Sequence, residues 1–202
     1  MSITGLDLRR RALFALTDRL PCRLIPVART EGGPLKPYLE RYKLFDLPGD
    51  RRVYLHRFVS SDPERGYHNH PWDSVSFPLV GSYLERIFHP SEEKTQVVGA
   101  GTYNTITQEK FHRVELLTPD AWTLFFRSGT SNGWGFIFRD KTPGNNIWQS
   151  WIDKPENTGS RWVFSGHTEQ TDEVGGWEGI PLGKDADRQP FRAYDRGHWT
   201  ED

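Results

Sequence analysis

Cysteine is almost missing from this chain of 202 residues, because Cys22 is the only one. A single cysteine excludes an internal disulfide framework and a zinc site built from thiolates. Long apolar runs are missing as well, since no stretch approaches the roughly 18 residues of a membrane helix. The opening residues, MSITGLDLRRRALFALTDRLP, also lack an apolar segment of signal-peptide length. We therefore expect a cytoplasmic protein with no membrane partner.

A dominant charge of one sign is lacking too. Lys and Arg number 26 against 27 Asp and Glu, which gives a formal net charge of -1. Such a balance produces no global field that would recruit nucleic acid or an anionic membrane. The segment LRRRALF carries consecutive arginines, but no wider basic stripe accompanies them, so a solvated helix face explains them better. We expect no nucleic-acid partner.

The first clear element is a helix. Residues 6–19, LDLRRRALFALTDR, place apolar side chains on one face and arginines on the other, and Pro21 ends the segment. Residues 22–50 are mixed, with EGGP and LPGD as turns. That part of the chain yields no predicted strand.

From residue 52 the sequence takes on a pattern that is typical of strands. Short runs of β-branched and aromatic residues are separated by turns, with no helix between them. The predicted strands are 53–59, 74–80, 82–89, two within 95–106, 112–117, 121–127 and 134–139. Pro78 points to an edge position or a bulge in the second of them. This pattern predicts an all-β antiparallel sandwich or barrel, not parallel βαβ units.

The chain divides into three parts. We predict an N-terminal helix with a lead-in segment over 1–50, a β-barrel over 51–152, and a polar arm over 153–202. A chain of this length can build one well-packed core and is short for two. The arm contains isolated tryptophans and no clear period. It is either an extended arm over the domain or a partner subunit, or a partly disordered tail.

The segment GYHNHPWD, residues 66–73, places His68 and His70 one residue apart. In an extended chain, residues i and i+2 point to the same face, so both imidazoles can reach one metal ion. A third ligand should come from another strand on the same surface. His112, which opens the predicted strand in FHRVELL, is the best candidate. His56 could point inward and support the ligands, although a pair of histidines at this spacing also arises by chance.

These motifs resemble the cupin superfamily, whose fold is a jelly roll, also called a double-stranded β-helix. His68 and His70 match the histidines of its first motif, Gly81 the glycine that ends it, and His112 the histidine of its second motif. The resemblance covers roughly residues 52–140 and is closest to small bacterial and phage-type cupins with HxHPWD followed by HRVEL. It implies a jelly roll with a metal site, and a homodimer is expected on this ground alone.

The chain departs from the usual first motif at the glutamate ligand, whose positions hold Ser74 and Val75. The resemblance therefore leaves two alternatives open. The site could consist of histidines alone, or Asp73 or Glu85 could supply a carboxylate by another route. Asp73 could instead cap a turn or fix a histidine tautomer, as metal sites commonly require.

Imidazole ligands suit Fe(II), Zn, Ni, Mn or Cu. We favour Fe(II) and an oxygenase that acts on a small organic substrate in an aromatic barrel mouth. The aromatic residues expected to line it are Tyr67, Trp72, Phe77, Tyr83, Phe125 and Trp134.

Two other functions stay open. A non-oxidative isomerase, epimerase or lyase would use the metal as a Lewis acid, with Tyr83 or Glu85 as the acid or base. A ligand-binding module without chemistry is the other.

Arg127 ends a late strand, where jelly-roll oxygenases commonly bind the carboxylate of 2-oxoglutarate with an arginine. Those enzymes usually carry HxD or HxE, so 2-oxoglutarate is the less favoured cofactor here.

Overall fold

The computed structural model describes residues 5–28, 35–62, 66–89, 92–130, 134–139, 148–153 and 177–190. Its helix is α1 (Gly5–Thr17), close to the predicted bounds. Its strands are β1 (Cys22–Ala28), β2 (Leu35–Leu47), β3 (Arg51–Phe58), β4 (Tyr67–His68), β5 (Ser74–Val80), β6 (Ser82–Ile87), β7 (Lys94–Gly99), β8 (Asn104–Ile106), β9 (His112–Leu116), β10 (Ala121–Arg127), β11 (Trp134–Arg139) and β12 (Trp148–Asp153). Within these ranges, no helix is long and apolar enough to cross a membrane.

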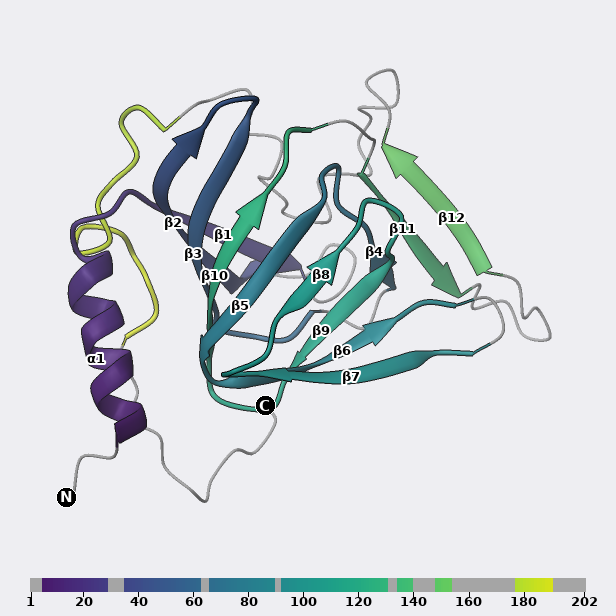
Figure 1. Cartoon of the computed structure of the whole chain (residues 1–202), viewed down its shortest axis with the longest axis horizontal. Coiled ribbons are helices and arrows are strands. Elements are labelled where there is room, and N and C mark those ends of the chain that lie inside the picture. Colours follow the sequence, from purple (N-terminus) through teal and green to yellow (C-terminus); the bar gives the residue numbers. More distant parts are fainter. Residues whose placement is uncertain are drawn as a thin grey trace.

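The strands form two six-stranded sheets (Figure 1). The order is β1-β2-β3-β10-β5-β8 in the first sheet and β12-β11-β4-β9-β6-β7 in the second. All pairs are antiparallel. Because neither sheet contains a parallel pair, no crossover helix is required between strands.

The connectivity is that of a jelly roll. The hairpin β6–β7 is enclosed along the sequence by the pairs β5–β8, β4–β9 and β3–β10 in turn. These nested pairs alternate between the second and the first sheet. A long hairpin wound in this way is the double-stranded β-helix. The predicted fold class, all-β with an N-terminal helix, is therefore confirmed.

The structure adds strands that the sequence did not predict. β1 and β2 extend the first sheet beyond β3, and β12 lies outside β11 in the second. Both β1 and β2 fall within the segment 22–50, where the mixed sequence pattern predicts no strand. LPGD forms the turn between β2 and β3, whereas EGGP lies outside the described residues.

Pro78 sits at a bulge. β5 pairs with β10 on one side and β8 on the other, so it is not an edge strand. The β10–β5 register shifts between Trp122 and Thr123, which pair with Val80 and Pro78. On its other side β8 pairs only with 74–76. Of the two predicted alternatives, the bulge is confirmed.

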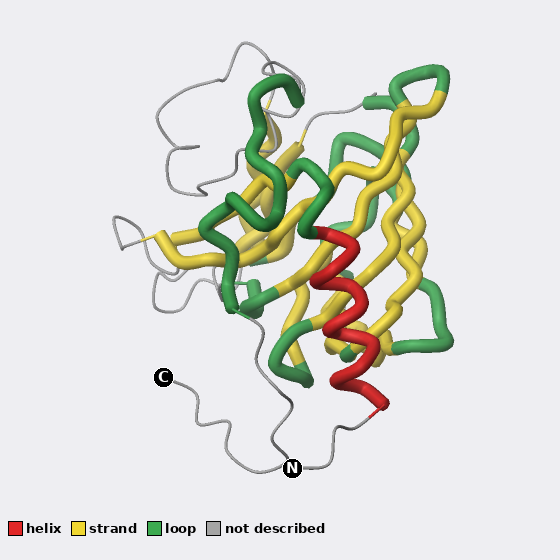
Figure 2. Tube along the Cα trace, turned by 90° about the vertical axis from the view of Figure 1, so that its left-hand side faces the viewer, coloured by secondary structure: helices red, strands yellow, loops and turns green. Residues whose placement is uncertain are grey.

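The helix covers the outer face of the first sheet. Trp122 on β10 stacks on Tyr42 at 5.9 Å between ring centroids and meets Phe14 of α1 edge-on at 5.4 Å. Figure 2 shows α1 lying across the strands. This layer leaves the space between the two sheets for the candidate site.

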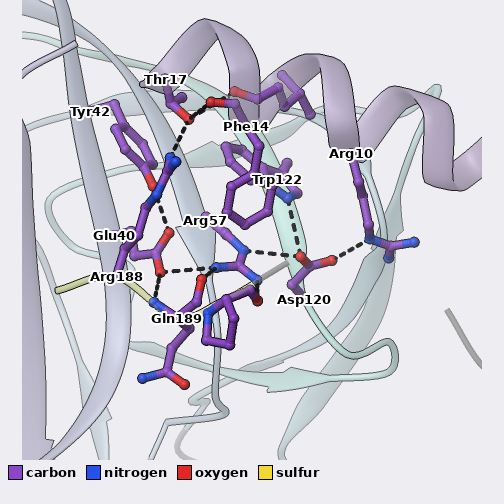
Figure 3. A network of polar contacts seen from close by, with 12 residues as sticks. Arg10, Phe14, Thr17, Glu40, Tyr42, Arg57, Asp120, Trp122, Arg188 and Gln189 are labelled. Atoms are coloured by element: carbon purple, nitrogen blue, oxygen red, sulfur yellow. Dashed lines mark hydrogen bonds and ion pairs between the residues drawn. The ribbon is translucent and has the colours of Figure 1, made fainter. Parts of the chain in front are cut away.

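Part of the predicted arm lies outside the described residues, namely 154–176 and 191–202. Residues 177–190, yellow in Figure 1, lie beside α1. The backbone nitrogen of Cys22 donates to Pro181 at 2.8 Å, and that of Gly183 donates to Leu20 at 2.9 Å. Figure 3 shows the polar network that joins this segment to α1 and the first sheet.

Candidate metal centre

Strand pairing in the second sheet brings the histidines together. β4 lies between β9 and β11, and His68 is in register with His112. β4 ends at His68, so His70 lies in the following loop and not in a continued strand as expected. Its side chain still returns to the other two rings. The predicted convergence of these side chains is therefore present, although a loop and not a strand supplies His70.

The three imidazoles form a nearly regular triangle. The ring centroids of His68, His70 and His112 are 5.1, 5.0 and 5.2 Å apart. One ligand nitrogen from each lies within 4.8 Å of the others, and the Nε2 atoms of His70 and His112 are 3.0 Å apart. With metal–nitrogen bonds of about 2.0–2.1 Å, two ligands at right angles would be about 3.0 Å apart. The three side chains could hold a metal ion.

Glu85 lies directly behind one of these rings. β6 pairs with β9 so that Glu85 faces Val114, and both point between the sheets, as does His112. The Glu85 carboxylate is fully buried, and its Oε1 is 2.6 Å from Nδ1 of His112. A proton on Nδ1 donates to this carboxylate and leaves the Nε2 lone pair for a metal. Glu85 thus orients the ring of a candidate ligand.

Glu85 is held ionised. Burial opposes its charge, but the hydrogen bond from His112 and the neighbouring charge of Lys110 outweigh that effect and hold its pKa well below the ordinary value. Lys110 Nζ and Gln96 Nε2 donate to Oε2 at 2.8 and 2.5 Å. The carboxylate is therefore fixed on both oxygens, and its orientation toward His112 is determined by several contacts.

A second carboxylate lies near His68. Asp62 Oδ2 is 4.0 Å from Nδ1 of His68 and accepts a hydrogen bond from the backbone nitrogen of Val114 at 2.7 Å. The sequence reading missed Asp62, because a loop residue before the histidine motif carries no local signal of this contact. Lys110 and Gln96 were missed as well, because their contacts with Glu85 depend on how distant segments pair.

A small pocket opens beside the triangle, with a volume of about 40 Å³. Its wall consists mainly of aromatic and apolar side chains, with a few polar groups. The lining residues are Tyr38, Leu39, Arg41, His56, Phe58, His68, His70, Trp72, Ser76, Tyr83, Ile106, His112, Val114 and Phe125. The histidines therefore share one small, largely apolar space, as is usual for a small-molecule site.

His56 lies in this pocket as a neutral group. Burial first, and the charges of Arg41 and His70 after it, lower its pKa well below the ordinary value. Arg41 Nε donates to His56 Nε2 at 3.1 Å, and Phe125 stacks on the imidazole at 4.5 Å. His56 is not part of the triangle of candidate ligands. Arg41 was missed by the sequence reading, because its strand was not predicted.

The other predicted site residues lie in different surroundings. Tyr83 lines the pocket, and burial raises its pKa to about 12. Asp73 is exposed, and its Oδ1 accepts from the backbone nitrogen of Gln108 at 2.9 Å, which resembles the predicted turn cap. Arg127 pairs with Asp50 at 3.3 Å and is not a lining residue. The structure does not bring Asp73 or Arg127 to the histidines.

Only some of the aromatic residues that were expected to line the barrel mouth line the pocket. Trp72, Tyr83 and Phe125 line the pocket. Tyr67 packs against Phe88 instead, at 5.8 Å between ring centroids. Phe77 is 40% exposed, and the side chain of Trp134 lies outside the described residues.

Comparison with known proteins gives partial fold matches only. No family model matches the chain, and no curated protein matches its sequence. Hydroxypropylphosphonic acid epoxidase from S. wedmorenis is 14% identical over 45% of this chain and 51% of its own, with a TM-score of 0.38. A structure from work on the DMSP lyases RdDddP and RnDddQII is 16% identical over 45% and 47%, with a TM-score of 0.37. CapF, a capsular polysaccharide assembling protein from Staphylococcus aureus, is 14% identical over 45% and 27%, with a TM-score of 0.38. The matches thus span about half or less of these solved chains.

Proposed function

We propose that this chain is a metal-dependent enzyme, an Fe(II) oxygenase that acts on a small organic substrate. One observation carries the proposal: His68, His70 and His112 present ring nitrogens to one point beside a small pocket. Among cupins, we propose the small HxHPWD group as its relatives, on GYHNHPWD and FHRVELL. When bound, Fe(II) on three imidazoles would supply a redox-active Lewis acid with open coordination positions.

The chain's own residues would prepare that site. Glu85 holds the tautomer of His112 that directs its Nε2 lone pair toward the other rings. Trp72 and Phe125 fill the pocket wall, which limits the water around a bound substrate. These side chains are buried, so little reorganisation accompanies substrate binding.

One observation favours a non-oxidative reaction as the second candidate. Tyr83 lines the pocket and, with its pKa raised to about 12, keeps its phenolic proton at neutral pH. Its hydroxyl accepts from Asn104 Nδ2 at 3.4 Å and has its own proton to donate. Tyr83 could therefore act as a general acid in an isomerase, epimerase or lyase. Turnover without oxygen would favour this candidate over the oxygenase.

Metal analysis tests the main proposal. We expect protein purified without oxygen to carry near-stoichiometric iron by elemental mass spectrometry, and the His112→Ala variant to lose it. His89→Ala is the matched control, because His89 is exposed and lies outside the triangle. Full metal content in His112→Ala would overturn the three-histidine assignment.

The identity of the metal directs the next step. Iron leads to oxygen-uptake screens with amino acids, thiols and 2-oxoglutarate. Zinc, nickel or manganese in its place, lost in the same variant, would keep the site and favour the non-oxidative reaction. If the protein takes up no metal on reconstitution, the metal-dependent enzyme is excluded. A ligand-binding module without chemistry would then be the favoured function.

A further inference from the structure

The hydroxyl of Tyr83 is bound by two side chains from the opposite sheet. Tyr83 lies on β6 of the second sheet, whereas Ser76 and Asn104 lie in register with each other on β5 and β8 of the first (Figure 1). All three residues are buried. Asn104 Nδ2 donates to the Tyr83 hydroxyl at 3.4 Å, and the hydroxyl of Ser76 makes a second hydrogen bond to it. The pairing of β5 with β8 therefore brings both partners to one phenol oxygen.

The amide of Asn104 has a defined orientation. Its Oδ1 accepts from Gln96 Nε2 at 3.0 Å and from Lys110 Nζ at 3.1 Å. A rotated amide would place its NH₂ group against these two donors, and an ammonium group has no lone pair to accept from it. The NH₂ group of Asn104 must therefore face Tyr83, whose oxygen acts as an acceptor in this contact.

The phenolic hydrogen of Tyr83 is directed elsewhere by these contacts. The hydrogen bond from Ser76 acts to lower the Tyr83 pKa, as a bond donated to the phenol oxygen does. With Asn104 and Ser76 both donating, the lone pairs of that oxygen are occupied and its own hydrogen is left to donate. Within the described part of the chain, no contact supplies an acceptor for it. Tyr83 lines the pocket, so this O–H group is a donor beside the candidate metal centre.

Tyr83 and the histidine triangle belong to one face of the second sheet. Residues i and i+2 of a strand share a face and lie about 7 Å apart. Tyr83 is one such step along β6 from Glu85, whose carboxylate contacts His112. A small organic molecule spans this distance, so one molecule beside the histidines reaches the Tyr83 hydroxyl.

We infer that Tyr83 donates its hydroxyl hydrogen to a carbonyl oxygen of the substrate, and that Ser76 and Asn104 are the residues that position it. This inference rests on the proposed function, because it takes the pocket beside the three histidines as the substrate site. A carbonyl oxygen suits the position better than a substrate hydroxyl. A hydroxyl would bring a hydrogen of its own, for which the occupied Tyr83 oxygen offers no lone pair. The substrate class is therefore a small carbonyl compound.

Fluorine NMR titration with trifluoroacetamide, a small neutral carbonyl compound, tests the inference on Zn(II)-loaded protein. We expect Tyr83→Phe to weaken its binding by about 2- to 10-fold, the range for one neutral hydrogen bond. Tyr103→Phe is the matched control, because it removes a phenol hydroxyl from a tyrosine that is 68% exposed. The affinity of this control should equal that of the wild type.

Asn104→Asp tests the positioning role. The variant keeps the shape of the side chain and an oxygen for Gln96 and Lys110, but it replaces the NH₂ donor by an acceptor. The Tyr83 hydrogen would then turn to the new carboxylate, so we expect a loss of affinity as large as in Tyr83→Phe. A role in packing alone would leave the affinity unchanged in this nearly isosteric variant. Ser76→Ala should also weaken binding, and wild-type affinity there would remove Ser76 from the assignment.

Two results would overturn the inference as a whole. They are equal trifluoroacetamide affinity in the wild type and Tyr83→Phe, and the absence of measurable binding to the wild type. If Tyr83→Phe does not fold, as judged by circular dichroism, the comparison of Asn104→Asp with the wild type replaces it.

The metal content of each sample separates this inference from the proposed function. Stoichiometric Zn(II) together with binding that does not depend on Tyr83 contradicts the inference and keeps the metal site. If the protein takes up no Zn(II), the proposed function fails, and the same titration on metal-free protein still tests Tyr83. Weaker binding in metal-free Tyr83→Phe would then support the carbonyl-binding pocket alone.

Discussion

At the scale of single residues, two of the candidate ligands have a carboxylate behind the ring. Glu85 contacts His112 at 2.6 Å, and Asp62 lies 4.0 Å from His68. Such partners fix the tautomer and direction of a ligand before a metal arrives. Because the Glu85 contact is shorter and its other oxygen is bound by Lys110, we expect Glu85 to contribute more.

Glu85→Gln tests this role. The amide keeps the shape of the side chain but loses the charge that holds the proton on His112 Nδ1. We expect metal affinity to fall by about 10- to 100-fold, measured by chelator competition with Zn(II). Glu115→Gln is the matched control, because Glu115 is on the neighbouring strand β9 and pairs with Arg86 on the outer face. Equal affinity in both variants would show that Glu85 does not position the ligand.

His56 predicts a specific dependence of stability on pH. Its pKa in the folded protein is well below the ordinary 6.5, so the unfolded chain binds this proton first as the pH falls. The stability that neutral His56 contributes is complete above about pH 6.5. It declines below that value by at most about 1.4 kcal/mol per pH unit, until the folded-state pKa is reached.

The comparison with His56→Gln isolates this effect. Glutamine can still accept the hydrogen bond from Arg41 but does not titrate. We expect the free energy of unfolding, from urea denaturation between pH 7.5 and 5.5, to fall less steeply in the variant than in the wild type. Parallel declines would mean that His56 is not buried in its neutral form.

At the scale of elements, the sequence predicted β3 and the strands from β5 to β11. Residues 74–80 and 121–127 were predicted with the bounds that the structure shows. β1 and β2 were missed, because Pro26 and Pro37 interrupt their patterns and proline argues against a strand. The structure places these two prolines opposite each other, at a shift in the register. Arg41, on the second of these strands, was missed with them.

The same limit applies to the site. His68, His70 and His112 were predicted because spacing and strand starts are visible in a sequence. The position of Glu85 behind His112 depends on the register of β6 against β9, and that of Asp62 on a contact with the backbone of β9. Such contacts follow from pairing between distant segments, which local patterns do not encode.

Gly81 joins β5 to β6 and allows a close approach that only glycine permits. Its φ is +79°, and a Cβ there would lie 2.1 Å from the carbonyl oxygen of Asp120. Gly101 has a similar φ of +90° but nothing within 4 Å. We expect Gly101→Ala to cost about 1–2 kcal/mol for the backbone conformation alone, and Gly81→Ala about 1–3 kcal/mol more for the clash. Equal losses in urea denaturation would contradict this account.

At the scale of the whole molecule, a buried ionic network joins α1, the first sheet and the C-terminal segment (Figure 3). Arg57 on β3 donates to Glu40 at 2.9 Å and to Asp120 at 3.0 Å, and Arg10 of α1 donates to Asp120 at 2.7 Å. The backbone nitrogen of Gln189 donates to Glu40 at 2.7 Å. These charged residues are at most 4% exposed. Helix, sheet and C-terminal segment therefore depend on one another through the same charges.

Because a buried charge without its partner is costly, Glu40→Gln should destabilise the protein strongly. We expect a loss of about 3–5 kcal/mol in the free energy of unfolding. Asp185→Asn, which alters the exposed pair with Lys184, should change stability by less than about 0.5 kcal/mol.

Hydrogen exchange distinguishes local from global loss. Cys22 and Gly183 donate their amide hydrogens across the contact between the C-terminal segment and the helix side of the fold. If the network holds that segment, these amides should lose protection in Glu40→Gln before those of the β6–β9 pair, which lies in the other sheet. Loss of protection at the same rate everywhere would mean that the segment and both sheets open as one cooperative unit.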